Sequence, residues 1–486
     1  MKLKFYFLIC TIAAVLLCGC TGVKETPAES SVYTYIEPTQ EVYVTTETET
    51  LTETTAPITA TISETETSTI PTTVTTAETT GETATETTTV TTVEATTTET
   101  TATTEETAET VTTTEETTVT AQSTAAAETE ETVSESTAEI APQLYEADFR
   151  ADEEHVKISG RTFTDNSGTV ILSNTYSSIE FAFCGTSAEI TLTSDCSGAD
   201  ARVGIFVNGK RVIDTMLTNK TTTLKVFEST ELKNCIVSVV KLSEQSNSYV
   251  GVKKIHAVSE YGIIPTPERE RKIEFIGDSI TCGYGIDAPN EHYDFSTETE
   301  DGSKTYAALI GKELDADINI VAWSGIGAYS CYTSGDEPSQ WKLISGVYEN
   351  TDTMHTSKKW DFSKWQPDVV VINIGTNDNS WTRGIADRVD TFGKAYYDFI
   401  CQVREANPDA YIICSLGAMG KELLPEIQEQ VKQYTADTGD TQITTFEFDM
   451  QNGYRDGYGA DYHPSAKTHQ KMADKLAPFI AELMNW

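Results

Sequence analysis

Short apolar runs alternate with longer amphipathic stretches from residue 270 to the C-terminus. An apolar run bounded by turn residues is typical of a buried strand, and apolar residues spaced three or four apart are typical of a helix that packs on one face. Their alternation predicts an α/β domain over residues 270–486, with a parallel sheet covered on both faces. The expected strands are 273–276, 318–322, 369–374, 411–416 and 443–448, and the expected helices are 306–314, 385–405, 423–435 and 465–484.

Residues 143–264 have a different pattern, in which apolar and polar residues alternate over short segments. This period of two predicts strands with one buried face. Asn208-Gly209, between two such segments, is a strong signal for a β-hairpin. Roughly seven short strands predict an all-β sandwich, most simply a jelly roll. The pattern does not decide whether this domain is a carbohydrate-binding module or a packing partner for the α/β domain. The expected strands are 156–163, 178–183, 188–193, 203–207, 222–227, 236–242 and 252–258.

The first 142 residues show neither periodicity. Residues 1–20 have a basic start and a short apolar run that ends in Leu-Cys-Gly-Cys, which resembles a bacterial lipoprotein signal peptide. We expect cleavage after Gly19 and lipidation of Cys20, with an ordinary secretory signal as the alternative. Residues 21–142 are rich in Thr and Glu and are expected to form a disordered linker. The expected location is therefore extracellular, on a bacterial membrane that the protein contacts only through its lipid.

Charge and cysteine spacing exclude several classes of partner. The net charge is -41, whereas nucleic-acid binding needs clustered Lys and Arg, so no nucleic acid is expected as a partner. The cysteines after Cys20 have no C-x-x-C spacing, so they predict no metal site, and they indicate no disulfide framework. Residues 437–440 read Asp-Thr-Gly-Asp and lack the later Gly and Glu of a calcium loop, so there is no dockerin signature.

The turn Gly277-Asp278-Ser279 is the first candidate for chemistry. It ends the first apolar run of the α/β region, where a parallel strand would pass into its helix. Ligands bind at the carboxyl ends of strands in open α/β sheets, and this makes Ser279 a candidate nucleophile. Asp and Ser are also favoured helix caps, so the turn alone could be purely structural. We expect Asp278 to brace the turn.

Three later loops favour the catalytic interpretation. Gly325 follows the second expected strand and Asn377 follows the third, so both fall at the same sheet edge as Ser279. A glycine N–H and an Asn amide are donors of the kind that stabilise an oxyanion, and the N–H of Ser279 would be a third. His463 precedes the last helix and can act as the general base, and Asp461 can orient it.

The order of these motifs closely resembles the SGNH hydrolases, also called the GDSL family, over roughly residues 271–486. The resemblance implies a flavodoxin-like three-layer fold. It also implies acyl transfer in which Ser279 is the nucleophile and His463 is the base, with no metal or cofactor. The oxyanion hole would comprise the N–H groups of Ser279 and Gly325 and the amide of Asn377. The motifs are Gly-Asp-Ser (277–279), Gly325, Gly-Thr-Asn-Asp (375–378) and Asp-Tyr-His (461–463).

A narrower resemblance comes from residues 277–285, which read Gly-Asp-Ser-Ile-Thr-Cys-Gly-Tyr-Gly and follow the expected jelly roll. This combination looks like carbohydrate esterase family 2. Enzymes of that family remove acetyl groups from plant cell-wall polysaccharides such as xylan and glucomannan. The resemblance therefore implies an extracellular serine esterase that acts on acetylated polysaccharide or oligosaccharide.

The sequence departs from the wider SGNH pattern beside the base. That pattern has Asp three residues before the His, and the position is Ala460 here. The nearest acid, Asp461, lies two residues before His463. Family 2 esterases are similar in this respect and can orient the His through a backbone carbonyl instead. We expect Asp461 to orient His463, with a backbone carbonyl as the alternative. His469, on the last helix, is expected to be a surface or capping residue.

Aromatic residues near the motifs are candidates for stacking on sugar rings. Tyr329 or Tyr332 follows the glycine loop, Trp381 follows the Gly-Thr-Asn-Asp turn, and Tyr462 adjoins the base. We select Tyr332, Trp381 and Tyr462, although each could equally be a packing residue. Two other functions stay open from the sequence: a lysophospholipase or thioesterase of the same fold, and a surface carbohydrate-binding protein without catalysis.

Overall fold

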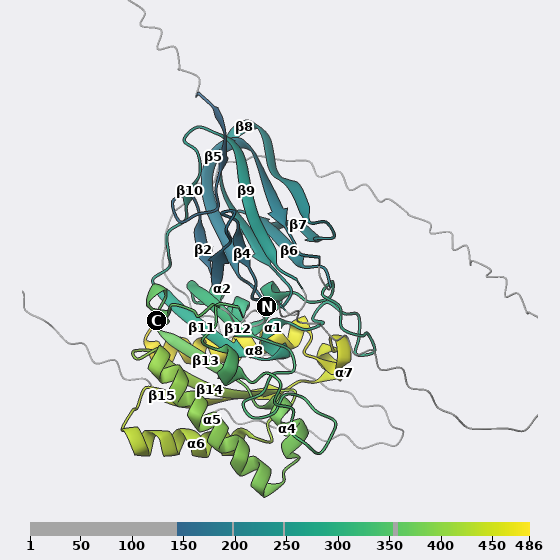
Figure 1. Ribbon diagram of the computed structural model, residues 1–486, viewed down its shortest axis with the longest axis vertical. Helices are drawn as coiled ribbons and strands as arrows, with labels where there is room; N and C mark the ends of the chain where they lie inside the picture. Colours follow the sequence, from purple (N-terminus) through teal and green to yellow (C-terminus); the bar gives the residue numbers. More distant parts are fainter. Residues whose placement is uncertain (1–142, 197–198, 246–247, 353–357) are drawn as a thin grey trace, which may run out of the picture. The chain divides into compact units, whose positions relative to one another are not determined.

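The computed structural model describes residues 143–196, 199–245, 248–352 and 358–486. The expected signal peptide (1–20), the lipidation site Cys20 and the expected linker (21–142) lie outside the described residues. The described part has an all-β region followed by an α/β region, so the predicted fold class is confirmed (Figure 1). Among its helices, none combines the length and the apolar character that a membrane span requires. The cysteines of this part are all free thiols.

The all-β region is one ten-stranded antiparallel sheet. Its two longest strands, β5 and β8, run through the whole sheet, and the partner of β5 on its other side changes along its length. The first half of β5 pairs with β2 and β10, the second half pairs with β9, and β8 runs alongside both. A register shift after Gly185 marks the change of partner, as a β-bulge does when it bends a strand. The strands are β1 (Tyr145–Phe149), β2 (Lys157–Ser159), β3 (Thr162–Thr164), β4 (Val170–Leu172), β5 (Ser178–Thr193), β6 (Arg202–Val207), β7 (Lys210–Met216), β8 (Thr221–Lys241), β9 (Val250–Ser259) and β10 (Ile264–Pro265).

The predicted hairpin at Asn208-Gly209 is confirmed. It joins β6 to β7, and both turn residues have positive φ, at 50° and 76°. This geometry suits a tight turn between twisted strands, and it explains why Asn and Gly occupy the two positions. The alternating residues of β5 place every second side chain in a core that it shares with β8 and β9.

The α/β region contains a parallel five-stranded sheet in the order β12-β11-β13-β14-β15. This is the flavodoxin-like order 2-1-3-4-5. All five predicted strands are present, and β12 and β13 are buried along their whole length, as strands covered on both faces must be. The strands are β11 (Arg271–Gly277), β12 (Ala316–Ala322), β13 (Val369–Asn373), β14 (Tyr411–Ala418) and β15 (Ile443–Met450).

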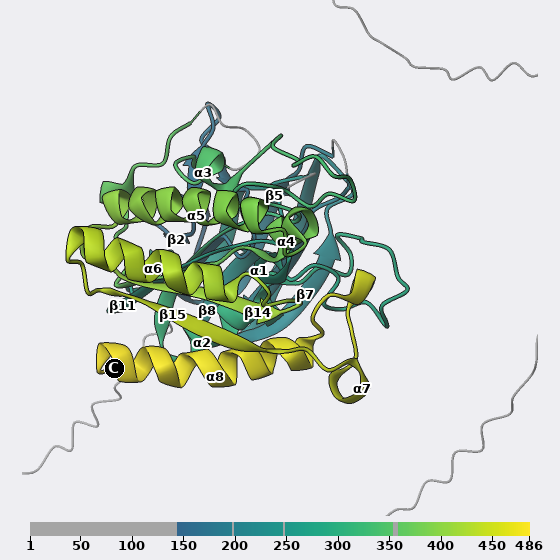
Figure 2. The ribbon, with the colours of Figure 1, turned by 90° about the horizontal axis from the view of Figure 1, so that it is seen from below.

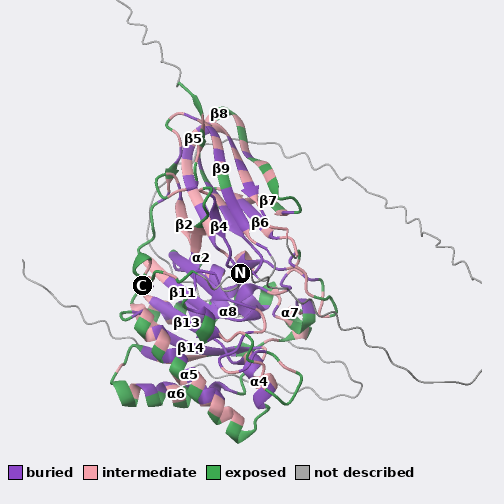
Figure 3. Ribbon diagram, in the orientation of Figure 1, coloured by how far each residue is buried: buried purple, intermediate pink, exposed green. Residues whose placement is uncertain are grey.

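Helices cover both faces of this sheet. α5 and α6 pack with one core cluster of the sheet, and α2 and α8 pack with the other, so the layers are helix, sheet and helix (Figure 2). Their buried faces lie on the strands and their outer faces are exposed (Figure 3). The longer helices are α2 (Tyr306–Glu313), α5 (Ala386–Ala406), α6 (Leu424–Thr438) and α8 (Ala466–Met484). The short ones are α1 (Ser279–Cys282), α3 (Ile344–Val347), α4 (Thr376–Thr382), α7 (Gly453–Asp456) and the 3₁₀ turns η1 (Gly302–Lys304), η2 (Phe362–Lys364) and η3 (Ala460–Tyr462).

Ion pairs join the two regions, and in each the cation comes from the all-β region and the carboxylate from the α/β region. The most deeply buried joins Arg161 to Glu274 of β11 at 2.9 Å, with neither side chain more than 2% exposed. Removing either partner of such a pair would leave an uncompensated charge, so the two regions depend on each other for stability. The other pairs are Lys157–Asp317, Arg202–Asp287 and Arg211–Asp301.

Candidate active site

Ser279 is the first residue of α1, directly after β11 and the Asp278 cap. The Asp278 carboxylate accepts a hydrogen bond from Ile280 N–H at 3.0 Å, which braces the turn as predicted. Gly277 permits the sharp turn, since a Cβ there would lie 1.9 Å from Thr281 Oγ1. These contacts hold the Ser279 hydroxyl at the carboxyl edge of the sheet.

His463 meets Ser279 across this edge. Its Nε2 lies 2.9 Å from Ser279 Oγ, which is the contact that a nucleophile and its general base require. Its Nδ1 lies 3.1 Å from the carbonyl oxygen of Ala460. Since a carbonyl only accepts, Nδ1 carries the proton and Nε2 is left to accept from the serine. Burial lowers the pKa of His463 to about 4, against the opposing effect of the Ala460 carbonyl, so the imidazole is neutral at pH 7.

The structure corrects the expected role of Asp461. Its carboxylate accepts a hydrogen bond from the Tyr284 hydroxyl at 2.8 Å, and the atom that faces His463 Nδ1 is the Ala460 carbonyl oxygen. The physical reason is the backbone of η3, where Asp461 has a left-handed φ of 48°. This conformation directs the carboxylate to Tyr284, so the Ser279–His463 pair is oriented through main chain.

Tyr284 is a component of the site that sequence reasoning missed. Its ring stacks on the His463 imidazole, with centroids 4.0 Å apart, and its other neighbour in the stack is Phe295 at 4.4 Å. The flanking Gly285 has a positive φ, and a Cβ there would lie 2.3 Å from Ala460 Cβ. The Gly-Tyr-Gly order was the available signal, because such a backbone lets a tyrosine approach a neighbouring loop closely.

Gly325 lies in the loop after β12, and Asn377 lies in the first turn of α4, which follows β13, so both are at the expected edge of the sheet. Gly325 has a φ of +80°, and within the described residues its N–H has no hydrogen-bond partner. The Asn377 amide donates to the Ile326 carbonyl at 2.8 Å and to Asp278 Oδ2 at 3.2 Å. Asn377 therefore ties the glycine loop to the nucleophile turn, and its service as an oxyanion donor stays a prediction.

Two buried carboxyls shape the same edge. Asp378 accepts hydrogen bonds from the backbone N–H groups of Ala328, Tyr329 and Ser330, which fold the glycine loop. Burial raises the pKa of Asp378 to about 6 in spite of these bonds. Burial likewise raises the pKa of Asp278 to about 7. Both carboxyls hold loops in place and do not contact His463.

The expected aromatic platform is only partly present. Trp381 is 7% exposed and its indole N–H donates to the Asp336 carbonyl at 3.1 Å, so it is a packing residue and the expectation of a sugar contact is corrected. Tyr332 and Tyr462 are 67% and 52% exposed, and the Tyr462 ring also lies against Tyr458, with centroids 5.5 Å apart. Trp341, which the sequence analysis did not select, is also exposed and packs edge-on against Trp323, two residues before Gly325.

One group of side chains near the site has the composition of a metal site. Glu244, Cys282 and Glu300 are buried, and their ligand atoms lie within 4.8 Å of one another. The buried Lys241 ammonium lies beside them and donates to the carbonyl of Glu244 at 2.8 Å. Because this ammonium already balances negative charge there, the group fits a cation poorly.

Two family models match the chain. Residues 158–267 match the N-terminal domain of carbohydrate esterase 2, and residues 273–476 match the GDSL-like lipase/acylhydrolase family. The first match lies in the all-β region and the second runs from β11 into α8. Together they include the Ser279 turn, the loops after β12 and β13, and His463.

Two bacterial enzymes are among the curated proteins that are similar in sequence. The cellulase/esterase CelE of Acetivibrio thermocellus is 34% identical over 314 residues, which cover 64% of this chain and 37% of CelE. An acetylxylan esterase / glucomannan deacetylase of Cellvibrio japonicus is 24% identical over 339 residues, which cover 69% of this chain and 91% of that protein. The chain thus spans little more than a third of the length of CelE.

A solved structure matches both regions. It is a family two carbohydrate esterase from Clostridium thermocellum in complex with cellohexaose, with 32% sequence identity and a TM-score of 0.61. The match covers 68% of this chain and 99% of that one. An all-β region followed by a parallel α/β region is therefore shared along the whole length of that relative.

Proposed function

This chain belongs to carbohydrate esterase family 2, and on that premise we propose that it is a serine esterase that removes O-acetyl groups from plant cell-wall polysaccharides such as xylan and glucomannan. The observation that carries the proposal is the 2.9 Å contact between Ser279 Oγ and a neutral His463 Nε2. The similarity to an acetylxylan esterase / glucomannan deacetylase supports the choice of substrate.

The proposed reaction is a two-step acyl transfer. His463 Nε2 takes the Ser279 hydroxyl proton as Oγ attacks the acetyl carbonyl carbon. The negative charge that develops on the carbonyl oxygen is stabilised by the N–H groups of Ser279 and Gly325 and by the Asn377 amide, which gives up its longer bond, at 3.2 Å to Asp278, to donate to this oxygen. His463 then protonates the departing sugar oxygen. A water molecule, deprotonated by His463, attacks the acetyl-enzyme and releases acetate and free Ser279.

The main-chain hydrogen bond at Nδ1 gives His463 its orientation during this cycle. The Ala460 carbonyl accepts from Nδ1–H at 3.1 Å and stabilises the imidazolium that forms when Nε2 takes the proton. A carboxylate in that position would do so more strongly. The proposed mechanism is therefore that of a Ser–His dyad.

We place the polysaccharide against the exposed rings of Tyr332 and Tyr462. Exposed aromatic rings suit stacking on sugar rings, and a relative has been solved with cellohexaose. Tyr332→Ala and Tyr462→Ala should raise KM on acetylated polymer several-fold. The same variants should leave the hydrolysis of 4-nitrophenyl acetate unchanged, because this small ester does not reach the rings. A polymer KM that equals the wild-type value would remove the two residues from the proposed site.

We propose that the enzyme is an extracellular lipoprotein, anchored through a lipid on Cys20. The support is the Leu-Cys-Gly-Cys sequence after an apolar run. Expression in a bacterial host should yield membrane-associated protein that labels with a fatty-acid analogue. Cys20→Ala should lose the label and the membrane association. A labelled Cys20→Ala variant would contradict this assignment.

The esterase proposal is tested by acetate release from acetylated xylan and acetylated glucomannan, with Ser279→Ala as the inactive control. Release by the wild type and loss of at least about a thousandfold in Ser279→Ala is the expected result. Glycan binding without acetate release would make the protein a binding module. Preferential hydrolysis of a long-chain lysophospholipid would make it a lipase of the same fold.

A further inference from the structure

Glu244 belongs to the all-β region, but its carboxylate contacts two segments of the proposed active site. Its Oε2 accepts a hydrogen bond from the backbone N–H of Ser324 at 2.8 Å, and the Cys282 thiol lies 3.5 Å from the same oxygen. Ser324 immediately precedes Gly325, and Cys282 is the last residue of α1, which begins at Ser279. One carboxylate therefore touches both segments that carry the proposed backbone donors of the oxyanion hole.

Glu244 is itself held in one position. Its N–H donates to Glu300 Oε2 at 2.8 Å, and its carbonyl accepts from Lys241 Nζ at 2.8 Å. Glu244 is 3% exposed, and both Lys241 and Glu300 are fully buried. A packed polar group with these bonds cannot relax without leaving a buried donor or acceptor unpaired. The carboxylate is thus a rigid support for the loop that it contacts.

Burying three ionisable side chains together costs free energy, and the packing of the two regions does not require it. Burial raises the pKa values of Glu244 and Glu300 and lowers that of Lys241 to about 8. Replacement of buried ionic groups by apolar side chains of similar volume is often neutral or stabilising. A buried polar cluster at this point is therefore better explained by the geometry that it imposes on the Ser324–Gly325 turn.

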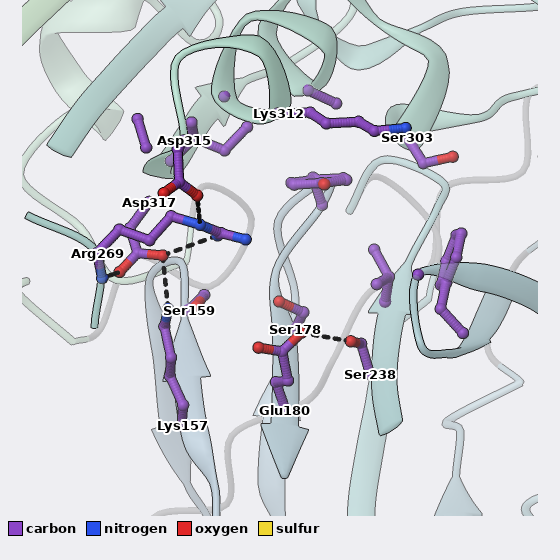
Figure 4. Close-up of a pocket in the computed structure, with 18 of the residues that line it drawn as sticks. Lys157, Ser159, Ser178, Glu180, Ser238, Arg269, Ser303, Lys312, Asp315 and Asp317 are labelled. Carbon is purple, nitrogen blue, oxygen red and sulfur yellow. Dashed lines mark hydrogen bonds and ion pairs between the residues drawn. The ribbon is translucent and has the colours of Figure 1, made fainter. Parts of the chain in front are cut away.

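Another part of the boundary between the two regions has contacts of a different kind. Lys157 pairs with Asp317 at 2.6 Å, and Arg269 pairs with Asp315 and Asp317, in a cleft beside the first residues of β12 (Figure 4). Ser238 donates to Glu180 in the same cleft (Figure 4). These side chains pair with one another beside the amino ends of the parallel strands. Ligands bind at the opposite edge of such a sheet. The Lys157–Asp317 pair thus joins the two regions at this edge, away from the site.

We propose that Glu244 is a positioning residue of the esterase, which fixes the Ser324–Gly325 turn so that the Gly325 N–H points at the oxyanion. The all-β region thereby completes the active site. The inference rests on the proposed esterase function. It predicts a defect in the chemical step, because the Gly325 donor acts on charge that develops in the transition state and little on the bound ester.

The test compares Glu244→Ala, Glu244→Gln and the control Lys157→Met, with 4-nitrophenyl acetate and acetylated xylan as substrates. Glu244→Ala should lower kcat by about 10- to 100-fold and leave KM within about twofold, as expected when an oxyanion donor is displaced. Glu244→Gln should restore most of kcat, since its amide oxygen can still accept from Ser324 N–H. Lys157→Met should lower Tm and leave both kinetic constants unchanged.

Several outcomes would overturn the inference. Wild-type kcat in Glu244→Ala would do so, and so would losses of kcat that follow Tm alike in all three variants. If Glu244→Ala does not fold, Glu244→Asp replaces it, because the shorter carboxylate stays charged but cannot reach Ser324; unchanged kcat in this variant would overturn the inference. Absence of esterase activity in the wild type would instead contradict the proposed function, and the two failures are thus distinguishable.

Discussion

The imidazole of His463 lies against the phenol ring of Tyr284, with ring centroids 4.0 Å apart and an angle of 26° between the planes. The Tyr284 hydroxyl donates to Asp461, so the carboxylate expected to orient the base reaches it only through this ring. The stack restricts rotation of the imidazole. It also places an aromatic face on the imidazolium that forms in each half-reaction, which is a favourable cation–π arrangement.

Tyr284→Leu is expected to lower kcat because the charged form of His463 loses its aromatic neighbour. A cation–π contact of about 0.5–2 kcal/mol corresponds to a loss of roughly 2- to 30-fold. Tyr284→Phe keeps the ring and loses only the bond to Asp461, so it should stay within about threefold of the wild type. Steady-state hydrolysis of 4-nitrophenyl acetate measures both variants. Equal losses in Phe and Leu would attribute the effect to the hydroxyl.

Asp461→Asn should have a small effect on catalysis. The acid of a Ser-His-Asp triad contributes about 10⁴-fold to kcat, but here the Ala460 carbonyl holds His463 Nδ1. We expect kcat to fall by less than about tenfold. The negative charge of Asp461 raises the pKa of His463, so its removal should move the acid limb of the pH profile to lower pH. A loss of more than about a hundredfold would restore Asp461 as the triad acid.

The pH profile of the wild type should report the buried base. His463 must be neutral to accept the Ser279 proton, and burial lowers its pKa to about 4. Activity is therefore retained as the pH falls through 6.5, the ordinary pKa of histidine, and kcat/KM should decline only near pH 4. Acetate release, with circular dichroism at each pH to verify folding, measures this limb. A half-maximal kcat/KM near pH 6.5 in folded protein would refute the assignment.

His469 was expected to be a surface or capping residue, but it is buried, and its burial makes the free energy of unfolding depend on pH. The residue is 1% exposed, and its Nδ1 accepts from the Tyr306 N–H at 3.2 Å, so it is a core residue. Burial lowers its pKa to about 3. The unfolded chain binds a proton near pH 6.5 and the folded chain does not, so the free energy of unfolding falls as the pH falls from 6.5 toward 3.

His469→Asn tests this linkage. An Asn oxygen can replace Nδ1 as the acceptor for Tyr306 N–H, but it does not titrate. Between pH 6.5 and pH 4.5 the wild type should lose up to about 1.4 kcal/mol per pH unit more than the variant does. Urea unfolding at several pH values gives the difference. Parallel stability curves for the two proteins would show that His469 does not titrate in this range.

The positions of Ser279, Gly325 and Asn377 could be predicted because they depend on local signals. Each follows an apolar run that ends in a turn, and the edge of a parallel sheet gathers such turns. His463 was predictable for a similar reason, since a Pro-Ser cap follows it and marks the start of the last helix. The class and order of the elements followed from the same periodicities.

Side-chain directions within loops could not be predicted in this way. Asp461 faces Tyr284 because of a left-handed φ, a conformation that Asp tolerates but that its presence in a sequence does not require. Trp381 was selected as a candidate for sugar stacking because it follows the Gly-Thr-Asn-Asp turn, but α4 places it on its buried side. Glu244 and Tyr284 contact residues that are far from them along the chain, Ser324 and Asp461, so the sequence gives no sign of these contacts. For Glu244 and Tyr284, the approach of distant segments determines the contact, and local propensity does not.

Arg161 provides a last test, because it lies in the all-β region and its charge is balanced in the α/β region. Its guanidinium donates to Glu274 at 2.9 Å and to the backbone carbonyls of Tyr348 and Asn350, and it is fully buried. Glu274 also accepts from the Tyr348 hydroxyl and the Asn319 amide, so it has no route to solvent.

Arg161→Met should therefore destabilise the protein by about 3–5 kcal/mol, because it leaves the Glu274 carboxylate buried without a cation. The double variant Arg161→Met/Glu274→Gln should recover more than half of that loss, since Gln carries no charge and its one amide oxygen can still accept from Asn319, which donates to Oε1 of Glu274. Only the bond from Tyr348 to the other oxygen, Oε2, is lost. Urea unfolding at pH 7 measures the single and the double variant and so separates the loss of the cation from the cost of the buried carboxylate. Lys157→Met, which breaks the Lys157–Asp317 pair, is the control. A loss of less than about 1 kcal/mol in Arg161→Met would contradict this prediction, and the pair would then contribute hydrogen bonds but no net ionic attraction between the two regions.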